Sequence, residues 1–374
     1  MRCAKINEDI KYNPDAIRLR KEANIGLKGG VLKSKNNLFV VDTHTEGEPT
    51  RIILSGFPKL KGDTLYDKRK FMQENFDHLR TSTLLEPRGH DNQFGALVLQ
   101  TDNRSADYAL IFMENNGYLD MCGHATIGVT TALIELGMVE PTEPYNEITY
   151  ETVAGLVKVK ALIKNGSVAE VSLVDVLSFH LGAFEVKIDG GMSIPVDLAY
   201  GGNFYVITDA KNLNTKVRRG YIDELIRKGI MLRDEAARQI DVYHPDAPDV
   251  PQKIGLAMIT DEPELRESDG KNIVVFGNSQ FDRSPCGTGT AARLSILYNQ
   301  GLLGVGETFI HESIIGTTFR ARILQTTKVG SYDAVVPEIT GRAFITQIAH
   351  IIIDPDDPLK NGFSTLKSRS HVHE

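Results

Sequence analysis

The chain has few of the residues that mark several common classes of protein. Its 374 residues include no tryptophan and only three cysteines, too few for the disulfide framework of a small secreted protein. No apolar run approaches the ~20 residues that a membrane-spanning helix needs. We therefore expect a protein of a reducing compartment, the cytoplasm, with no membrane partner.

A strong charge of one sign is also missing. The net charge of −7 comes from 42 basic and 49 acidic residues that are interspersed along the chain, which favours solubility and no particular partner. No patch of basic and aromatic residues indicates a nucleic-acid partner. The chain is too long for one ordinary hydrophobic core, so we expect two domains.

The domain prediction divides the chain near residue 190. Residues 1–37 read as an N-terminal extension, with one short helix at 14–23, because they lack an apolar core segment. Residues 38–190 are predicted to form the first domain and 191–344 the second. The apolar tail after residue 343 should return to a sheet, so that 345–374 completes the first domain.

Hydrophobic periodicity predicts an alternation of strands and helices. Strands are expected at 38–41, 51–54, 96–100, 108–113, 148–153, 156–162, 169–173, 196–200 and 273–276. Helices are expected at 67–81, 123–136, 223–228, 234–239 and 290–299.

One arrangement of strand, loop, cysteine and helix occurs twice. The first copy reads Met121-Cys122-Gly123-His124-Ala125-Thr126 and the second Pro285-Cys286-Gly287-Thr288-Gly289-Thr290. Each copy follows an apolar strand and leads into a helical pattern that ends at a glycine, Gly137 or Gly301. This internal duplication predicts two similar halves that could face each other across a small molecule.

The start of a helix suits a reactive cysteine. Its unpaired N–H groups and positive dipole end should lower the pKa of a thiol and can hold a carboxylate. Gly123 and Gly287 lack the Cβ that would keep a ligand from the backbone. Cys122 and Cys286 could then serve as the base and the acid on opposite faces of the α-carbon of a 2-amino or 2-hydroxy acid.

Other readings of these residues remain open at this point. A single buried cysteine is usually a small hydrophobic residue, although duplication in two motifs disfavours that reading. A disulfide between Cys122 and Cys286 is an alternative if the halves touch. Zinc needs about four ligands, and His124 and Asp282 do not complete any common zinc spacing, so we expect no metal. Nothing indicates pyridoxal phosphate, so we expect no cofactor.

Asp282 and His124 each have two readings of their own. Either could bind a substrate amine, but Asp282 could equally cap a turn and His124 could bond to the backbone. The charged turn Glu86-Pro87-Arg88-Gly89-His90-Asp91 is read as structural, and Cys3 lies outside the duplicated pattern.

Taken together, four segments resemble the proline racemase family over roughly residues 38–365. They are Met121-Cys122-Gly123-His124, Asp282-Arg283-Ser284-Pro285-Cys286-Gly287-Thr288-Gly289-Thr290, Asp42-Thr43-His44-Thr45-Glu46-Gly47-Glu48 and Glu86-Pro87-Arg88-Gly89-His90. The resemblance implies the α/β fold of diaminopimelate epimerase, with two pseudo-symmetric halves that each wrap a curved, mostly antiparallel sheet around a central helix. It also implies an active site in the cleft between the halves, cofactor-independent two-base catalysis and a homodimer.

The resemblance also implies roles for individual residues. Cys122 and Cys286 would be the two acid/base residues. Backbone groups of Gly123, His124, Gly287 and Thr288 would bind the substrate carboxylate. Asp282 and the His124 side chain would bind the ring nitrogen.

The resemblance also bears on the substrate, because members of the family act on different proline derivatives. The dehydratases of trans-3-hydroxyproline replace one catalytic cysteine, commonly the second, so Cys286 argues against that activity. Phe94 and Phe276 align with positions that are phenylalanine in members acting on proline and polar in 4-hydroxyproline epimerases. A buried hydroxyl without a partner costs ~1–3 kcal/mol, so proline is favoured and 4-hydroxyproline is the alternative. A non-catalytic thiol switch or amino-acid-binding protein is the second alternative.

Overall fold

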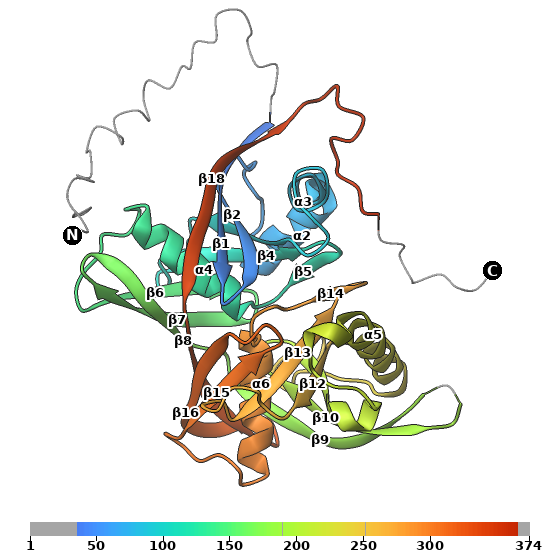
Figure 1. The fold of residues 1–374 in the computed structure, drawn as a ribbon. Coiled ribbons are helices and arrows are strands. Elements are labelled where there is room, and N and C mark those ends of the chain that lie inside the picture. Colours follow the sequence, from blue (N-terminus) through green and yellow to red (C-terminus); the bar gives the residue numbers. More distant parts are fainter. Residues whose placement is uncertain (1–35, 189, 251, 366–374) are drawn as a thin grey trace, which may run out of the picture.

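A computed structural model describes residues 36–188, 190–250 and 252–365, which form two lobes joined by one continuous sheet (Figure 1). We call 36–174 together with 343–365 the first lobe, which is uppermost in Figure 1, and 178–341 the second lobe. The helix expected at 14–23 lies outside the described residues.

The first lobe holds nine strands and three α-helices among its described residues. The strands are β1 (Asn36–Thr45), β2 (Glu48–Ser55), β3 (Phe94–Leu99), β4 (Tyr108–Glu114), β5 (Gly117–Leu119), β6 (Tyr145–Thr152), β7 (Gly155–Lys164), β8 (Ser167–Val174) and β18 (Ala343–Ile353). The helices are α2 (Leu65–Asn75), α3 (Asp77–Leu84) and α4 (Gly123–Glu135).

The second lobe has the same number of strands among its described residues. They are β9 (Ser178–Lys187), β10 (Ser193–Tyr200), β11 (Phe204–Asp209), β12 (Ile254–Asp261), β13 (Gly270–Phe276), β14 (Gln280–Phe281), β15 (Thr308–Ser313), β16 (Thr318–Val329) and β17 (Tyr332–Gly341). Its α-helices are α5 (Ile222–Gln239) and α6 (Gly287–Asn299), with short 3₁₀ helices at Ala210–Leu213 and Arg219–Tyr221.

The strand pairing of the first lobe recurs in the second. β1 pairs antiparallel with β2, β2 parallel with β3, β3 antiparallel with β4, and β4 parallel with β6, after which β6 to β8 run antiparallel. Strands β10 to β17 repeat the same sequence of parallel and antiparallel pairs. The structure therefore confirms the internal duplication over whole lobes.

The strand that pairs with the first strand of the hairpin, β1 or β10, comes from a different part of the chain in each lobe. β18 pairs with β1 from Ile353 to Ala343, which confirms that the apolar tail returns to a sheet in the first lobe. Its counterpart β9 pairs with β10 and packs against α6. The sequence predicts a domain boundary near residue 190. We propose that it lies earlier, before β9, because β9 pairs with β10 and β17 and packs against α6 of the second lobe.

The two central helices end where their glycines predict, and α6 begins at Gly287, three residues before the start expected at 290. Each has 13 residues, each has its cysteine at the N-cap position, and each is followed by a glycine with positive φ, 66° at Gly137 and 70° at Gly301. Glycine adopts this left-handed conformation without the strain that a Cβ brings, so it ends the helix. Both helices are surrounded by the curved sheets of their lobes (Figure 1).

Two helix predictions were wrong. The helix expected at 67–81 is two helices, α2 and α3, which meet at Phe76, where φ is −134°. The two helices expected at 223–228 and 234–239 are one, α5. Gly229 lies in the middle of α5, and a Cβ there would come within 2.8 Å of the side chain of Val275, so this glycine lets the helix pack closely on β13.

Several strands had no counterpart in the prediction. They are β5, β9, β11, β12, β14, β15, β16 and β17, and Phe204, expected in a loop, begins β11. The first half of β16 alternates buried and exposed residues with threonine or arginine on the outer side, which weakens its apolar pattern. In contrast, β11 and β12 are almost wholly buried, so they lack the alternation that marks a half-buried strand.

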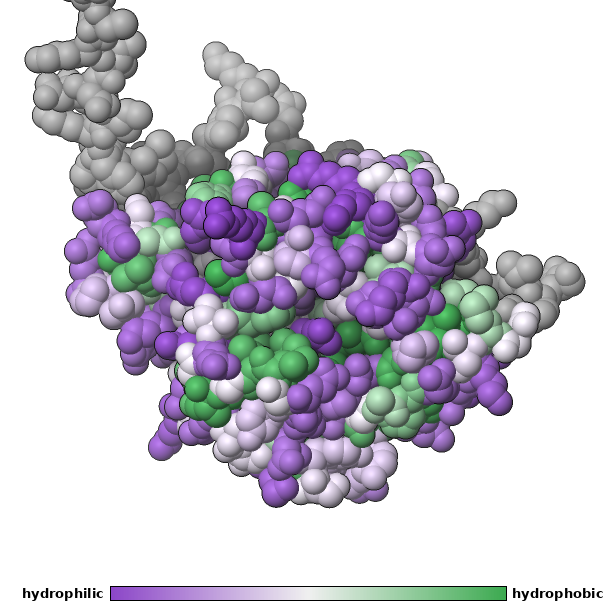
Figure 2. All heavy atoms as spheres, turned by 60° about the horizontal axis from the view of Figure 1, so that its bottom comes forward, coloured by the Kyte–Doolittle hydropathy of each residue, from purple (hydrophilic) through white to green (hydrophobic). Residues whose placement is uncertain are grey.

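Buried residues join the two lobes. One hydrophobic cluster contains residues of α4 and its sheet together with Leu294, Leu297 and Phe319 of the second lobe. On the face in Figure 2, apolar residues lie in several groups separated by hydrophilic ones. Among the described residues, no helix combines the length and the apolar character needed to cross a membrane.

Candidate active site

The N-termini of α4 and α6 meet where the two lobes join. A Cβ built on Gly123 would lie 2.9 Å from the Cα of Gly287, and the reverse contact has the same length. Only glycine at both positions allows this approach, because real Cβ atoms essentially never come so close. The contact brings Cys122 and Cys286, which directly precede these glycines, into one site.

The thiols of this site are enclosed. Cys122 is 5% exposed and Cys286 is 6% exposed, and both are free cysteines. The alternative of a structural disulfide between them is therefore not the state of this structure.

The surroundings of Cys122 combine an imidazole and an aromatic ring. Its Sγ lies 3.2 Å from Nδ1 of His124, and the ring of Phe94 meets the His124 ring edge-on with 4.8 Å between centroids. Burial lowers the pKa of His124 to about 3, so this imidazole is neutral. A resting ion pair between imidazolium and thiolate is thus disfavoured.

Hydroxyl groups surround Cys286 instead. Its Sγ lies 3.5 Å from the Tyr205 hydroxyl and 3.9 Å from Oγ1 of Thr288, and those two oxygens are 2.5 Å apart. Phe276 belongs to the same buried cluster as Cys286 and Tyr205. The sequence does not mark Tyr205 as a site residue, because it follows an ordinary glycine-rich turn and carries no motif of its own.

The backbone at Cys286 is strained, unlike that at Cys122. Cys286 has a φ of 65°, in a region that residues other than glycine rarely adopt. Cys122 has an extended backbone with a φ of −146°. Strain of this kind is typical of functional sites, where the surrounding structure holds a residue in place.

The expectation that the helix start lowers the thiol pKa is wrong. Burial raises the pKa of both thiols, and the carboxylate of Asp282 raises both further. The backbone N–H groups of Ala125 and Gly289 act in the expected direction, but burial outweighs them. Charge on Cys286 also raises the pKa of Cys122, which favours one thiolate at a time.

Asp282 supplies the negative charge of the site. Its Oδ1 accepts hydrogen bonds from the backbone N–H and the hydroxyl of Ser284, at 2.8 and 2.7 Å. Its Oδ2 lies 3.9 Å from Nδ1 of His124. Burial raises the pKa of Asp282 to about 6. Two acceptors at this separation can both bind one nitrogen that carries two N–H groups.

Backbone N–H groups line the helix ends. The first helical hydrogen bonds run from Thr126 N to Cys122 O and from Thr290 N to Cys286 O. The N–H groups of Gly123, His124, Gly287 and Thr288 precede these bonds, which is the position where helices hold carboxylates. Four of the predicted substrate-binding residues therefore lie together.

Further buried residues hold the two cysteine loops. Asn272 Nδ2 donates to Pro285 O at 3.0 Å, and His311 Nδ1 lies 2.8 Å from the Thr290 hydroxyl. The Thr45 hydroxyl donates to His124 O at 2.7 Å. Only the spatial arrangement shows that Asn272 and His311, distant in sequence, support this loop.

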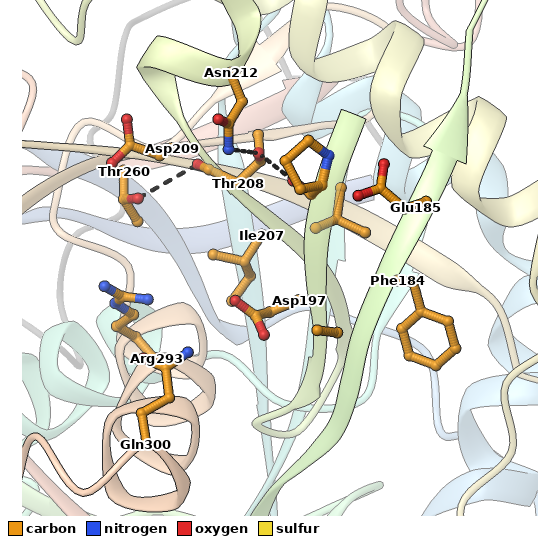
Figure 3. A pocket seen from close by; sticks show the side chains of 13 residues that line it. Phe184, Glu185, Asp197, Ile207, Thr208, Asp209, Asn212, Thr260, Arg293 and Gln300 are labelled. Atoms are coloured by element: carbon orange, nitrogen blue, oxygen red, sulfur yellow. Dashed lines mark hydrogen bonds between the residues drawn. The ribbon is translucent and has the colours of Figure 1, made fainter. Parts of the chain in front are cut away.

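Two cavities of the molecule lie away from the cysteines. One of about 480 Å³ opens in the second lobe between β9 to β12 and α6, and Figure 3 shows Arg293 among Asp197, Asp209 and Thr260 there. A second, of about 260 Å³, lies over β6 to β8 and β15 to β17. Neither contains a predicted site residue. Among the described residues, no group of three or more potential metal-binding side chains is found.

Comparisons with known proteins cover most of the chain. The family model described as "Proline racemase" matches residues 40–364. The chain is 44% identical to a proline racemase of Acetoanaerobium sticklandii over 335 residues, which cover 89% of this chain and 100% of that protein. It is 39% identical to a 4-hydroxyproline 2-epimerase of Shewanella loihica, over 89% of this chain and 99% of that protein.

A solved structure is similar over most of its length. A hydroxyproline epimerase from Agrobacterium vitis with bound trans-4-hydroxy-L-proline matches with a TM-score of 0.82 and 34% identity, covering 88% of this chain and 96% of that chain. The predicted fold class, two pseudo-symmetric α/β halves, is thereby confirmed.

Proposed function

Because the chain belongs to the proline racemase family and is an isomerase of the racemase and epimerase class, we propose that it interconverts L- and D-proline. In this proposal Cys122 and Cys286 exchange the α-proton of the substrate on opposite faces of the carbon. The mutual contact of Gly123 and Gly287 carries the proposal, because it brings the two cysteines together from opposite lobes.

The substrate would be held at both of its charged groups. Its carboxylate would accept hydrogen bonds from the N–H groups of Gly123, His124, Gly287 and Thr288 at the positive ends of two helices. Its ring nitrogen, with two N–H groups, would donate to Asp282 Oδ2 and to the neutral His124 ring, which are 3.9 Å apart. The α-carbon then lies between the two sulfurs.

The reaction would move one proton in and one proton out. A thiolate takes the proton from the α-carbon and becomes a thiol, while the opposite thiol donates its proton to the other face and becomes a thiolate. The enzyme therefore ends with the roles of the two cysteines exchanged, ready for the reverse reaction. The positive ring nitrogen beside Asp282 favours the thiolate, which burial alone disfavours.

Entry to this site would require the lobes to separate. Both cysteines are almost fully buried, and the two described cavities lie away from them. The structure thus has the features of a closed form, in which water is excluded from the reacting atoms.

The aromatic surroundings favour proline as the substrate. Phe94 is 2% exposed and its ring contacts His124, next to Cys122. Phe276 is 7% exposed and belongs to the same buried cluster as Cys286. The Tyr205 hydroxyl is already bound to Thr288. A 4-hydroxyl group buried between phenylalanines would lack a partner, at a cost of ~1–3 kcal/mol.

The test is to compare kcat/KM for L-proline and trans-4-hydroxy-L-proline in the same preparation of reduced protein. We expect proline to be preferred by about tenfold or more, as the cost of an unpaired hydroxyl predicts. A preference for hydroxyproline would replace this substrate assignment.

The second candidate is 4-hydroxyproline 2-epimerase with the same cysteine pair. The similarity to the Agrobacterium vitis epimerase with its bound ligand favours it. A non-catalytic thiol switch or amino-acid-binding protein, the other alternative considered for the sequence, does not fit a chain of this isomerase family. A homodimer and a cytoplasmic location remain predictions, which sedimentation and fractionation would test.

A further inference from the structure

Two hairpins occupy equivalent places in the two lobes and reach across to each other's cysteine loop. At the β10–β11 hairpin of the second lobe, Asn203 Nδ2 donates to the carbonyl of Met121, next to Cys122, at 3.2 Å. At the β1–β2 hairpin of the first lobe, Glu48 accepts from the backbone N–H of Arg283 at 2.7 Å. Each cysteine loop is therefore held by a side chain from the opposite lobe.

Each hairpin also contacts the central helix of its own lobe. The Thr45 hydroxyl binds the carbonyl of His124 in α4. A Cβ on Gly201 would come within 2.2 Å of the carbonyl oxygen of Thr288 in α6, so that turn lies directly against the helix. A hairpin that contacts both helix ends can fix their relative position.

The two bridging side chains differ in chemistry. Asn203 is neutral, whereas Glu48 is a carboxylic acid with 0% exposure. Only Oε2 of Glu48 has a partner; Oε1 is buried and makes no hydrogen bond within the described part of the chain. An ionised Glu48 would leave half of its charge without a donor, which is costly in the interior.

The charges that face Glu48 are mixed. Asp282 and the Cys122 thiol lie close enough for their charges to act on it, and the guanidinium of Arg283 lies 3.8 Å from Oε2. Burial and then Asp282 raise the pKa of Glu48 well above its ordinary value, while Arg283 acts in the opposite direction.

The other charged groups of the hairpin are engaged elsewhere. Glu46 accepts from the backbone N–H of Arg342, and Nδ1 of His44 accepts from the N–H of Gly47. They provide no donor for Glu48.

We propose that Glu48 is a positioning residue that holds the loop before Cys286 from the opposite lobe, and that it does so as a neutral carboxylic acid. This inference rests on the proposed racemase function. In its neutral form Glu48 resembles the amide of Asn203, so both cysteine loops are held by uncharged side chains.

Neutrality at Glu48 limits the negative charge next to the reacting thiols. Asp282 alone then balances the single positive charge of the substrate's ring nitrogen. An ionised Glu48 would add a second negative charge and raise the pKa of Cys122, so it would disfavour the thiolate. A neutral glutamic acid provides the hydrogen-bond acceptor without this effect.

The variants Glu48→Gln and Glu48→Ala separate the two parts of the proposal. Glutamine keeps an oxygen for the Arg283 N–H and cannot ionise. We therefore expect kcat/KM of Glu48→Gln to stay within about tenfold of the wild-type value. The pH above which kcat/KM declines should be higher in this variant than in the wild type. Alanine loses the acceptor, and we expect a loss of about 100-fold, because small misplacements of reacting groups have effects of this size. Equal losses in both variants would overturn the proposal.

A measurement without substrate tests the protonation directly. The infrared carbonyl band of a protonated carboxylic acid should be present in the wild type at neutral pH and missing in Glu48→Gln. Asp175→Asn is the matched control, since Asp175 is another buried carboxyl with an unpaired oxygen, in the loop between β8 and β9, and should leave the Glu48 band in place. The absence of a Glu48 band at neutral pH would contradict neutrality.

The two experiments fail in distinguishable ways. If the wild type turned over neither proline nor hydroxyproline, the proposed function would fail, while the infrared band would still report on Glu48. If the wild type were active and the band absent, only the inference about Glu48 would fail.

Discussion

The two cysteine sites share a topology and differ in their surroundings. Both cysteines cap a 13-residue central helix, and both helices are preceded by the same order of strands. Cys122, however, has an extended backbone and an imidazole neighbour, whereas Cys286 has a positive φ and two hydroxyl neighbours. Duplication has therefore preserved the placement of the sulfur and of the N–H groups, but not the groups around it.

This difference follows from the shape of the substrate that we propose. A carboxylate on the axis between two helix ends can be bound symmetrically, so Gly123 and Gly287 are equivalent. A ring nitrogen lies to one side of that axis and needs an acceptor at one place only. His124 and Asp282 provide it, and Thr288, the counterpart of His124, binds Tyr205 instead.

The largest expected effect comes from the sulfurs themselves. We expect Cys122→Ser and Cys286→Ser each to reduce racemisation by about 1,000-fold or more, because general acid–base groups contribute up to ~10⁴-fold. The double variant should be no slower than either single one, since both cysteines serve one reaction. Polarimetry with L-proline measures all three, and substantial activity in one single variant would break the equivalence of the two sites.

The glycine contact should come next. Gly123→Ala and Gly287→Ala each place a methyl group against the opposite helix, so we expect both to reduce kcat/KM by about 100-fold. Because the contact is mutual, the two losses should be similar. Gly137→Ala and Gly301→Ala are the controls: they strain a positive φ by about 1 kcal/mol of stability but meet no neighbour within 4 Å. Comparable losses of kcat/KM in these controls would count against the contact.

The pH dependence should depend on Asp282. Its pKa is raised from 3.8 to about 6, so between these values the folded protein holds a proton that the unfolded chain has lost. The free energy of unfolding should therefore fall as pH rises from about 4 to 6. In contrast, kcat/KM should rise about tenfold per pH unit there, since the ionised form binds the ring nitrogen.

Asp282→Asn tests this pair of trends. The amide cannot ionise, so the contribution of Asp282 to the pH dependence of unfolding should disappear in chemical denaturation. The same dependence in the variant and the wild type would assign it to another group.

The two phenylalanines should not be equivalent. Phe94→Tyr and Phe276→Tyr each add one hydroxyl, but the 4-position of the substrate ring lies on one side of the site. We expect one of the two variants to shift the kcat/KM ratio about tenfold towards 4-hydroxyproline and the other to leave it unchanged. Equal shifts would indicate that neither ring contacts that position.

The smallest expected effect is on the free energy of unfolding and comes from backbone strain at Cys286. Cys122→Gly and Cys286→Gly remove the same side chain, but only the second relieves a positive φ. Cys286→Gly should therefore be less destabilising, by about 1 kcal/mol in the free energy of unfolding. A larger loss in Cys286→Gly would show that its φ is not a source of strain.

Much of the candidate site could be predicted from the sequence, because its residues are adjacent in the chain. One run of the sequence contains Cys122, Gly123 and His124, and another extends from Asp282 to Thr288. The glycines after the two helices indicate where each helix ends. Tyr205, Asn203 and Glu48 reach the site from hairpins that are distant in sequence. No local pattern assigns a role to such residues.

The errors in secondary structure have physical causes. The break at Phe76 lies between two helix-forming segments, and a single Gly229 within α5 weakened a helix that packing against Val275 stabilises. The thiol pKa does not follow from the sequence, because a sequence shows the helix end but not the burial around it. Burial depends on the opposite lobe, which the sequence does not place.

The most direct test of two thiols on opposite faces is racemisation of L-proline in deuterium oxide, stopped at low conversion. We predict that the D-proline formed carries deuterium at its α-carbon while the recovered L-proline still carries hydrogen, because the incoming proton comes from the second cysteine. Equal deuterium in both enantiomers would contradict it, since a single group would then be serving both faces.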